Sequence, residues 1–356
     1  MSFFKFNNIT ISGIASAVPE NRYTIEELNK SFDSKKVKEF VDNTGFQSVR
    51  HSVDLQTASD LGFEAAKELL IKKEVDVSQI GFIIFISKTP DYRSPATAIV
   101  LQHRLKLPKD CLAYDVNLGS VGFATGLQLG CSLLNSLNTE QGLIIIGDTN
   151  SKQVNQNDIN SMILGDAATA ILLEKKETSL PIVIKQFSNG GNYDSYIVPQ
   201  GAFRITTDRP IVELSSDPNE GKFNKLVYNR AKMNEFYSSK IPESILDFLA
   251  TCKSNLPDFD LFAFQQSNIE TLKEIAEKLE INFSLIQLNI NDFGDTSASS
   301  VPLLLKSKNK NQRILSCSFG EGLSWAIADF YLEKNVVLPI VETDNYFDEG
   351  FVTHEM

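Results

Sequence analysis

The stretch AYDVNLGSVGFATGL, residues 113–127, predicts a change from strand to helix within a few residues. Residues 112–116 form a short apolar segment typical of a strand. Small and apolar residues follow, and they favour a helix over about residues 120–134. Ser120 stands at the junction, so we expect it at the beginning of a buried helix, where the helix dipole favours negative charge.

On both sides of this stretch, expected strands alternate with expected helices. The apolar runs at residues 81–87, 143–146 and 167–173 predict strands, and GFIIFIS at 81–87 is typical of a strand buried on both faces of a parallel sheet. Helices are expected after the capping box Thr24–Glu27, at residues 58–73 and from Ser94 and Pro95 onward. This alternation indicates an α/β fold.

The second half of the chain repeats the plan. We expect helices at residues 241–249 and 268–279, and strands at residues 261–264, 285–288, 313–317 and 325–332. The sequence thus predicts two α/β halves, residues 1–180 and 181–356, each with a mixed, mostly parallel sheet. Residues 188–232 are expected to be a loop-rich insert, and residues 335–356 a tail that wraps the surface.

Composition narrows the classes of partner. The chain has 356 residues and a net charge of −11, which argues against nucleic acid or an anionic membrane as a partner. The strongest apolar run, at residues 80–87, is too short to span a bilayer, and the N-terminus shows no signal-peptide pattern. The four cysteines show no disulfide or metal spacing and are expected to be reduced thiols. We therefore expect a cytoplasmic protein.

Several segments, in order along the chain, resemble the ketoacyl-ACP synthase III family of condensing enzymes. They are ITISGIASAVP (9–19), NTGFQSVRH (43–51), SPATAIVLQHRL (94–105), residues 113–127, LGDAATAILL (164–173), FAFQQSN (262–268), FGDTSASSVP (293–302) and SFGEGLSW (318–325). The resemblance covers the chain to about residue 334. It implies the thiolase-like αβαβα five-layer fold, built by internal duplication, and a dimer with active sites near its interface.

The resemblance also implies three catalytic positions, and all three carry an unexpected residue. Ser120 stands where the family has its acylated cysteine, Gln265 where it has histidine, and Asp295 where it has asparagine. A serine hydroxyl is a poor nucleophile unless a base removes its proton. An amide can donate hydrogen bonds but cannot carry charge, and an ionised carboxylate has no donor for an enolate. Decarboxylative condensation is therefore not expected.

The family's oxyanion hole consists of backbone N–H groups, which survive changes of side chain. The resemblance places it at Ser120 and Glu321, where Glu321 replaces the middle glycine of a GGG turn. We expect the Glu321 carboxylate to be solvated.

Positions that handle the substrate also differ from the family. Residues 38–43 (KEFVDN) lack the tryptophan and arginine that grip coenzyme A adenine in the family. The helix expected at 268–279 is acidic, which does not favour an acidic acyl carrier protein. The basic candidates for docking are Arg204, Arg230 and Lys232. No metal or resident cofactor is expected, and acyl-CoA or acyl carrier protein would be the substrate.

Three functions follow from these observations. The first is a diverged acyltransferase that acts through Ser120 on acyl-CoA or acyl carrier protein. The second is a catalytically inactive subunit that pairs with an active ketosynthase. The third is an orthodox synthase III, which the three substitutions oppose. A homodimer or heterodimer is expected to form through residues 94–124, because an exposed sheet edge there invites pairing.

Overall fold

The computed structural model describes residues 2–154, 157–206, 226–306 and 308–350. Its six-stranded sheet has the order β15 (Val341–Glu342), β2 (Ile9–Val18), β8 (Asp166–Lys175), β7 (Gln141–Thr149), β5 (Ile80–Ile86) and β6 (Leu112–Val116). The pairs β15–β2, β7–β5 and β5–β6 are parallel, whereas β2–β8 and β8–β7 are antiparallel. The four strands predicted within the N-terminal half, at residues 81–87, 112–116, 143–146 and 167–173, all lie in this sheet.

The five-stranded sheet has the order β1 (Phe3–Phe6), β9 (Ile182–Ser188), β14 (Ser324–Leu332), β13 (Gln312–Gly320) and β12 (Leu261–Phe264). The succession β12–β13–β14–β9 repeats the parallel, antiparallel, antiparallel pairings of β5–β7–β8–β2. This repetition is the expected internal duplication. The expectation of mostly parallel pairing is wrong for this sheet, because among its described pairs only β12–β13 is parallel.

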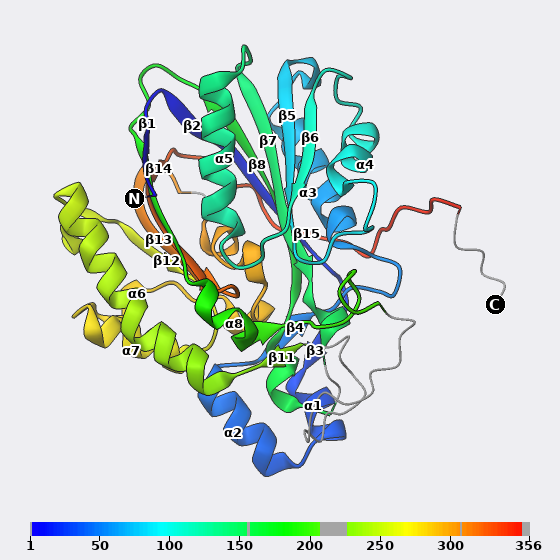
Figure 1. Cartoon of the computed structure of the whole chain (residues 1–356), viewed down its shortest axis with the longest axis vertical. Helices are drawn as coiled ribbons and strands as arrows, with labels where there is room; N and C mark the ends of the chain where they lie inside the picture. Colours follow the sequence, from blue (N-terminus) through cyan, green and yellow to red (C-terminus); the bar gives the residue numbers. More distant parts are fainter. Residues whose placement is uncertain (1, 155–156, 207–225, 307, 351–356) are drawn as a thin grey trace.

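Helices form three layers around the two sheets (Figure 1). Helix α5 (Gly122–Ser136) lies between the sheets, in one apolar core with residues of β5, β7, β13 and β14. Helices α3 (Ala58–Lys72) and α4 (Thr97–Arg104) pack on the outer face of the six-stranded sheet. Helices α6 (Arg230–Cys252) and α7 (Ile269–Lys278) cover the outer face of the other sheet. The predicted αβαβα arrangement is confirmed.

Smaller elements form the lower part of the molecule in Figure 1. They are β3 (Arg22–Thr24), β4 (Ser48–Arg50), α1 (Ile25–Ser31), α2 (Ser34–Thr44) and α8 (Ile290–Phe293), with β10 (Tyr196–Ile197) and β11 (Val227–Tyr228) nearby. The predicted capping box is present at the beginning of α1, where Thr24 and Glu27 satisfy each other's backbone N–H groups. Among the described helices none is long and apolar enough to cross a membrane.

Two local predictions are wrong. Helix α4 begins at Thr97, not at Ser94 and Pro95, because the Asp115 carboxylate accepts hydrogen bonds from the N–H groups of Thr97 (2.7 Å) and Ala98 (2.8 Å). A carboxylate from the neighbouring strand thus caps the helix, which the sequence around residue 94 does not reveal. The strand expected at 285–288 is only an isolated bridge between Phe262 and Ile286, after a 3-10 turn at Phe283–Leu285.

The ends of the chain tie the two halves together. Strand β1 joins the five-stranded sheet, and the tail returns to add β15 beside β2 in the six-stranded sheet. The expected loop-rich insert ends earlier than predicted, because α6 already begins at Arg230. Residues 207–225 of that insert lie outside the described residues.

Candidate functional site

The site lies where strand ends from both sheets approach the beginning of α5. Ser120 lies between β6 and α5, and Lys88 lies two residues beyond β5. Glu321 lies in the turn between β13 and β14, Gln265 directly follows β12, and Asp295 follows α8. Ends of strands at such crossings are the usual place for ligand sites in α/β folds.

Ser120 is bound through both its backbone and its hydroxyl group to a single carboxylate. Its N–H donates to Oε1 of Glu321 (3.0 Å) and its Oγ donates to Oε2 (2.9 Å). Ser120 is 6% exposed. Glycines permit this approach: a Cβ on Gly119 would lie 1.7 Å from Oε1 of Glu321, and one on Gly320 would lie 2.5 Å from Oγ of Ser120.

The Glu321 carboxylate points into the site, so the expectation that it is solvated is wrong. Its side chain is 17% exposed, and Oε1 lies 3.6 Å from the ammonium of Lys88. Burial alone raises the pKa of this carboxyl, but the charge of Lys88 and the hydrogen bonds from Ser120 hold it below its usual value. The N–H of Ser120, one of the two predicted oxyanion donors, is therefore occupied by an ionised side chain.

Lys88 is a functional residue that the sequence reasoning missed. Its Nζ donates to the hydroxyl of Tyr196 (3.0 Å) and lies 4.8 Å from the centre of that ring. Burial alone lowers the pKa of the ammonium, yet the charge of Glu321 and the neighbouring polar groups of Tyr196 and Asp148 raise it well above its usual value. Its position two residues after the most apolar strand of the sequence could have indicated a buried lysine, because the end of such a strand is expected to be buried.

Asp148 and Tyr196 surround Lys88 and were also missed. Oδ1 of Asp148 accepts hydrogen bonds from the backbone N–H of Lys88 (2.8 Å) and the hydroxyl of Ser87 (3.0 Å). Burial raises the pKa of Asp148 and that of Tyr196, although Lys88 opposes both shifts. The Lys88 ammonium thus lies beside Asp148 and Tyr196, two groups whose neutral forms are favoured by burial.

Gln265 and Asp295 form a second, separate network. Nε2 of Gln265 lies 3.1 Å from Oδ1 of Asp295, 3.2 Å from the carbonyl oxygen of Ser297 and 3.1 Å from Oγ of Ser300. The amide has only two hydrogens, so both are already used within the protein. Gln265 has no free donor for a bound enolate.

Asp295 is held by donors as well as by the amide. Its Oδ1 accepts the N–H of Ser297 (2.9 Å), and burial raises its pKa. In the described part of the chain no hydrogen bond joins Ser120 to Gln265 or Asp295. The nearest link is Ser297, whose Oγ lies 2.8 Å from where a Cβ on Gly119 would be.

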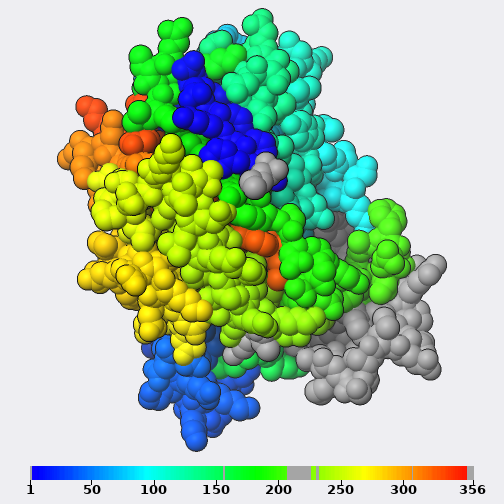
Figure 2. All heavy atoms as spheres, turned by 60° about the vertical axis from the view of Figure 1, so that its left-hand side comes forward, coloured from blue at the N-terminus to red at the C-terminus, as the bar shows by residue number. Residues whose placement is uncertain are grey.

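A part of the β13–β14 region reaches the surface of the molecule. In Figure 2 a small orange area, by its colour from the β13–β14 region, lies between the yellow-green surface of α6 and the green surface of residues near 190–200.

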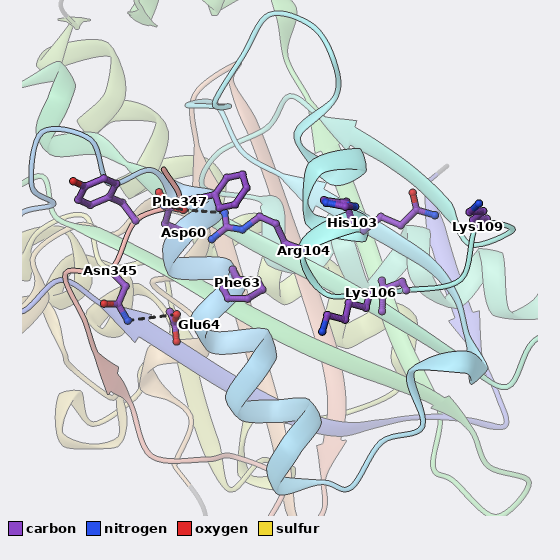
Figure 3. A pocket seen from close by; sticks show the side chains of 12 residues that line it. Asp60, Phe63, Glu64, His103, Arg104, Lys106, Lys109, Asn345 and Phe347 are labelled. Atoms are coloured by element: carbon purple, nitrogen blue, oxygen red, sulfur yellow. Dashed lines mark hydrogen bonds and ion pairs between the residues drawn. The ribbon is translucent and has the colours of Figure 1, made fainter. Parts of the chain in front are cut away.

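A pocket of about 750 Å³ lies elsewhere, between α3, α4 and the tail. Arg104 lies between the rings of Phe63 and Phe347, with its guanidinium 4.4 Å and 4.6 Å from their centres (Figure 3). Its NH1 is 2.8 Å from Oδ1 of Asp60. Arg104 therefore joins the tail, through Phe347, to helix α3, through Phe63 and Asp60. None of the candidate site residues lines this pocket.

Two of the three basic residues predicted as docking candidates have described side chains. Lys232 pairs with Asp194 at 3.6 Å, and Arg204 is exposed. The side chain of Arg230 lies outside the described residues. Among the described residues no group of three His, Cys, Asp or Glu is placed to bind a metal ion.

Comparisons with known proteins agree with the fold. The profile of the family described as 3-oxoacyl-[acyl-carrier-protein] synthase III matches residues 114–190, which include Ser120. The profile of the C-terminal part of the same family matches residues 249–331, which include Gln265, Asp295 and Glu321.

Individual relatives match almost the whole chain. A beta-ketoacyl-[acyl-carrier-protein] synthase III of Clostridium perfringens strain SM101 is 30% identical over 90% of this chain and 98% of its own. A putative 3-oxoacyl-[acyl-carrier-protein] synthase 3 of Campylobacter jejuni is 30% identical over 94% of this chain and 98% of its own. The crystal structure of a 3-oxoacyl-(acyl-carrier protein) synthase of Burkholderia xenovorans LB400 superposes with a TM-score of 0.90 and 28% identity, over 96% of this chain and 99% of that one.

Proposed function

This chain belongs to the 3-oxoacyl-[acyl-carrier-protein] synthase III family, and we propose that it transfers acyl groups through Ser120, taking them from acyl-CoA or acyl carrier protein in fatty acyl or polyketide-type metabolism. The observation that carries this proposal is the convergence of the N–H and O–H of Ser120 on one carboxylate, at the beginning of α5. Both donors point to a place where an acyl oxygen would be held beside the hydroxyl.

The transfer is a substitution at the thioester carbon. Oγ of Ser120 forms a bond to that carbon, the carbon–sulfur bond breaks, and an ester on Ser120 results. The hydroxyl proton passes first to Oε2 of Glu321, at 2.9 Å, and then to the leaving thiolate. Because Lys88 keeps the pKa of Glu321 low, this carboxylate is a weak base and we expect slow turnover.

Condensation with a malonyl group is not part of the proposal. An enolate needs donors aimed at its oxygen, and loss of one such donor costs about 3–4 kcal/mol of transition-state stabilisation. The hydrogens of Gln265 are used by Asp295, Ser297 and Ser300. Asp295, if ionised, adds a repelling charge. The orthodox synthase III activity is therefore disfavoured for this chain.

The second candidate function is a non-catalytic subunit paired with an active ketosynthase. It is favoured by the same Glu321 carboxylate, which satisfies Ser120 without any ligand. Strand β6 is the edge of the six-stranded sheet, and its first residue, Leu112, is 42% exposed, so this edge is available to a partner strand. We propose a dimer through this edge, with an identical or a related chain, and action in the cytoplasm.

Intact-mass spectrometry separates the two candidates. The purified protein is mixed with panels of acyl-CoA and acyl carrier protein, and the mass of an acyl adduct is sought, followed by peptide mapping to Ser120. We expect an adduct in the wild type and in the control Ser132→Ala, on the same helix, and none in Ser120→Ala. Absence of any adduct, together with co-purification of a ketosynthase, favours the non-catalytic subunit.

A further inference from the structure

The Glu321 side chain fills a complete binding site for a carboxylate. One oxygen accepts the N–H of Ser120 (3.0 Å), the other accepts its hydroxyl (2.9 Å), and the ammonium of Lys88 lies 3.6 Å away. Hydrogen bonds and charge combined in this way are the strongest contacts that a protein offers a carboxylate.

One oxygen of Glu321 makes two of these contacts. Oε1 accepts the N–H of Ser120 and also faces Lys88. An acyl carbonyl that is to be held by the N–H of Ser120 must take the place of this oxygen, while Oε2 can remain on the hydroxyl. Entry of a substrate therefore separates Glu321 from Lys88.

A neutral acyl group leaves Lys88 without its counter-ion. The Lys88 side chain is 13% exposed, and in the described part of the chain Glu321 is the carboxylate that forms its ion pair. Tyr196 offers only a neutral hydroxyl. Oδ1 of Asp148 is held by Ser87 and the Lys88 backbone, and its Oδ2 is buried without a hydrogen-bond partner. Burial raises the pKa of Asp148, which disfavours its charged form as a replacement counter-ion. Removing one partner of a buried pair is strongly unfavourable, because a buried charge remains.

Building on the proposed function, we propose that Lys88 selects acyl donors that carry a free carboxylate of their own, and that Glu321 is the internal stand-in for that carboxylate. The ligand class is a short dicarboxylic acyl thioester of the succinyl type. The acyl chain must be short. Oε1 of Glu321 contacts both the N–H of Ser120, where the acyl carbonyl would bind, and the ammonium of Lys88, where the acyl group's own carboxylate would bind, so the two binding positions are close together.

The first test compares succinyl-CoA with butyryl-CoA, which has the same four-carbon acyl chain without the charge. We expect Ser120 of the wild type to be acylated by succinyl-CoA at least about tenfold faster, a ratio that about 1.4 kcal/mol supplies. In Lys88→Met the ratio falls to near one. Equal rates in the wild type overturn the inference.

The second test examines the site without its internal occupant. Glu321→Gly is unfolded by heat in sodium acetate and in sodium chloride of equal ionic strength. Acetate is expected to raise the melting temperature in a saturable way, as a ligand of the native state does. The double variant Lys88→Met/Glu321→Gly is the matched control and should not respond. An equal response of both variants, or of neither, contradicts the carboxylate site.

These tests separate the inference from the function on which it rests. If butyryl-CoA acylates Ser120 as fast as succinyl-CoA, acyl transfer stands and the selectivity for a carboxylate fails. If no thioester acylates Ser120, the proposed transfer fails, and titration calorimetry of the two thioesters decides the inference. At least about tenfold tighter binding of succinyl-CoA upholds it, and equal binding overturns it.

Discussion

The two sides of the site are both buried and both polar, but they are satisfied in different ways. On one side, Ser120 donates two hydrogen bonds to Glu321, and Glu321 forms an ion pair with Lys88. On the other, Gln265 and Asp295 share hydrogen bonds that use both hydrogens of the amide. An ion pair is sensitive to any ligand that brings a charge. The Gln265 amide, in contrast, has no hydrogen left to donate to a ligand, although its Oε1 is buried without a hydrogen-bond partner. We therefore locate function on the serine side.

The largest expected effect comes from breaking the ion pair. Lys88→Met leaves the Glu321 carboxylate buried without a counter-ion, which should lower the free energy of unfolding by about 3–5 kcal/mol. The double variant Lys88→Met/Glu321→Gln should recover much of this loss. Urea unfolding measures both.

The control for this prediction is Lys240→Met. Lys240 pairs with Glu243 on the surface, and both side chains are more than half exposed, at 54% and 66%. Its loss should cost less than about 1 kcal/mol. A loss in Lys88→Met no larger than in this control would show that the buried pair is not the feature that distinguishes the serine side.

A smaller effect is expected on the other side of the site. Gln265→Leu removes the donor that Asp295 and the carbonyl of Ser297 share, and should lower the free energy of unfolding by about 1–3 kcal/mol. Gln128→Leu is the control, since that amide bonds only Ser132 on its own helix among the described contacts. Equal losses in the two variants would mean that the hydrogen bonds of Gln265 contribute no more to stability than the single side-chain hydrogen bond of Gln128.

The smallest effect is a difference in pH dependence. The pKa of Glu321 lies below its usual 4.5, so its contribution to stability is present above about pH 4.5 and is lost as the pH falls through the lowered value. The pKa of Asp295 lies above its usual 3.8, so its contribution is complete below that pH and is lost as the pH rises through the raised value.

Urea unfolding at a series of pH values tests these opposite signs. The stability difference between the wild type and Glu321→Gln should grow from acid to neutral pH. The difference between the wild type and Asp295→Asn should shrink over the same range. If the two stability differences changed with pH in the same direction, the charges assigned to the two sides of the site would be wrong.

Much of the fold could be predicted from local sequence. Apolar runs such as residues 80–86 indicated buried strands from their composition alone. The duplication and the catalytic positions at Ser120 and Gln265 were implied by the resemblance of the ordered segments to a known family. The cap of α4 by Asp115 was not predictable, because that carboxylate comes from a later strand.

The decisive part of the site was not predictable for the same reason. The hydrogen bonds from Ser120 to Glu321 join residues 201 positions apart, and Lys88 comes from a third segment. A glutamate in a glycine-rich turn has the sequence pattern of a solvated side chain. Only the packing of both sheets against α5 brings Lys88 close enough to stabilise the Glu321 carboxylate in the interior.

The central claim is that this site handles acyl groups without condensing them, and one assay tests it most directly. The purified protein is incubated with acyl-CoA and radiolabelled malonyl-acyl carrier protein and nothing else, and ketoacyl product is measured over time. We expect no ketoacyl-acyl carrier protein, because both hydrogens of the Gln265 amide are used within the protein and are not available to the enolate. Robust product formation by the wild type, lost in Ser120→Ala, would contradict it.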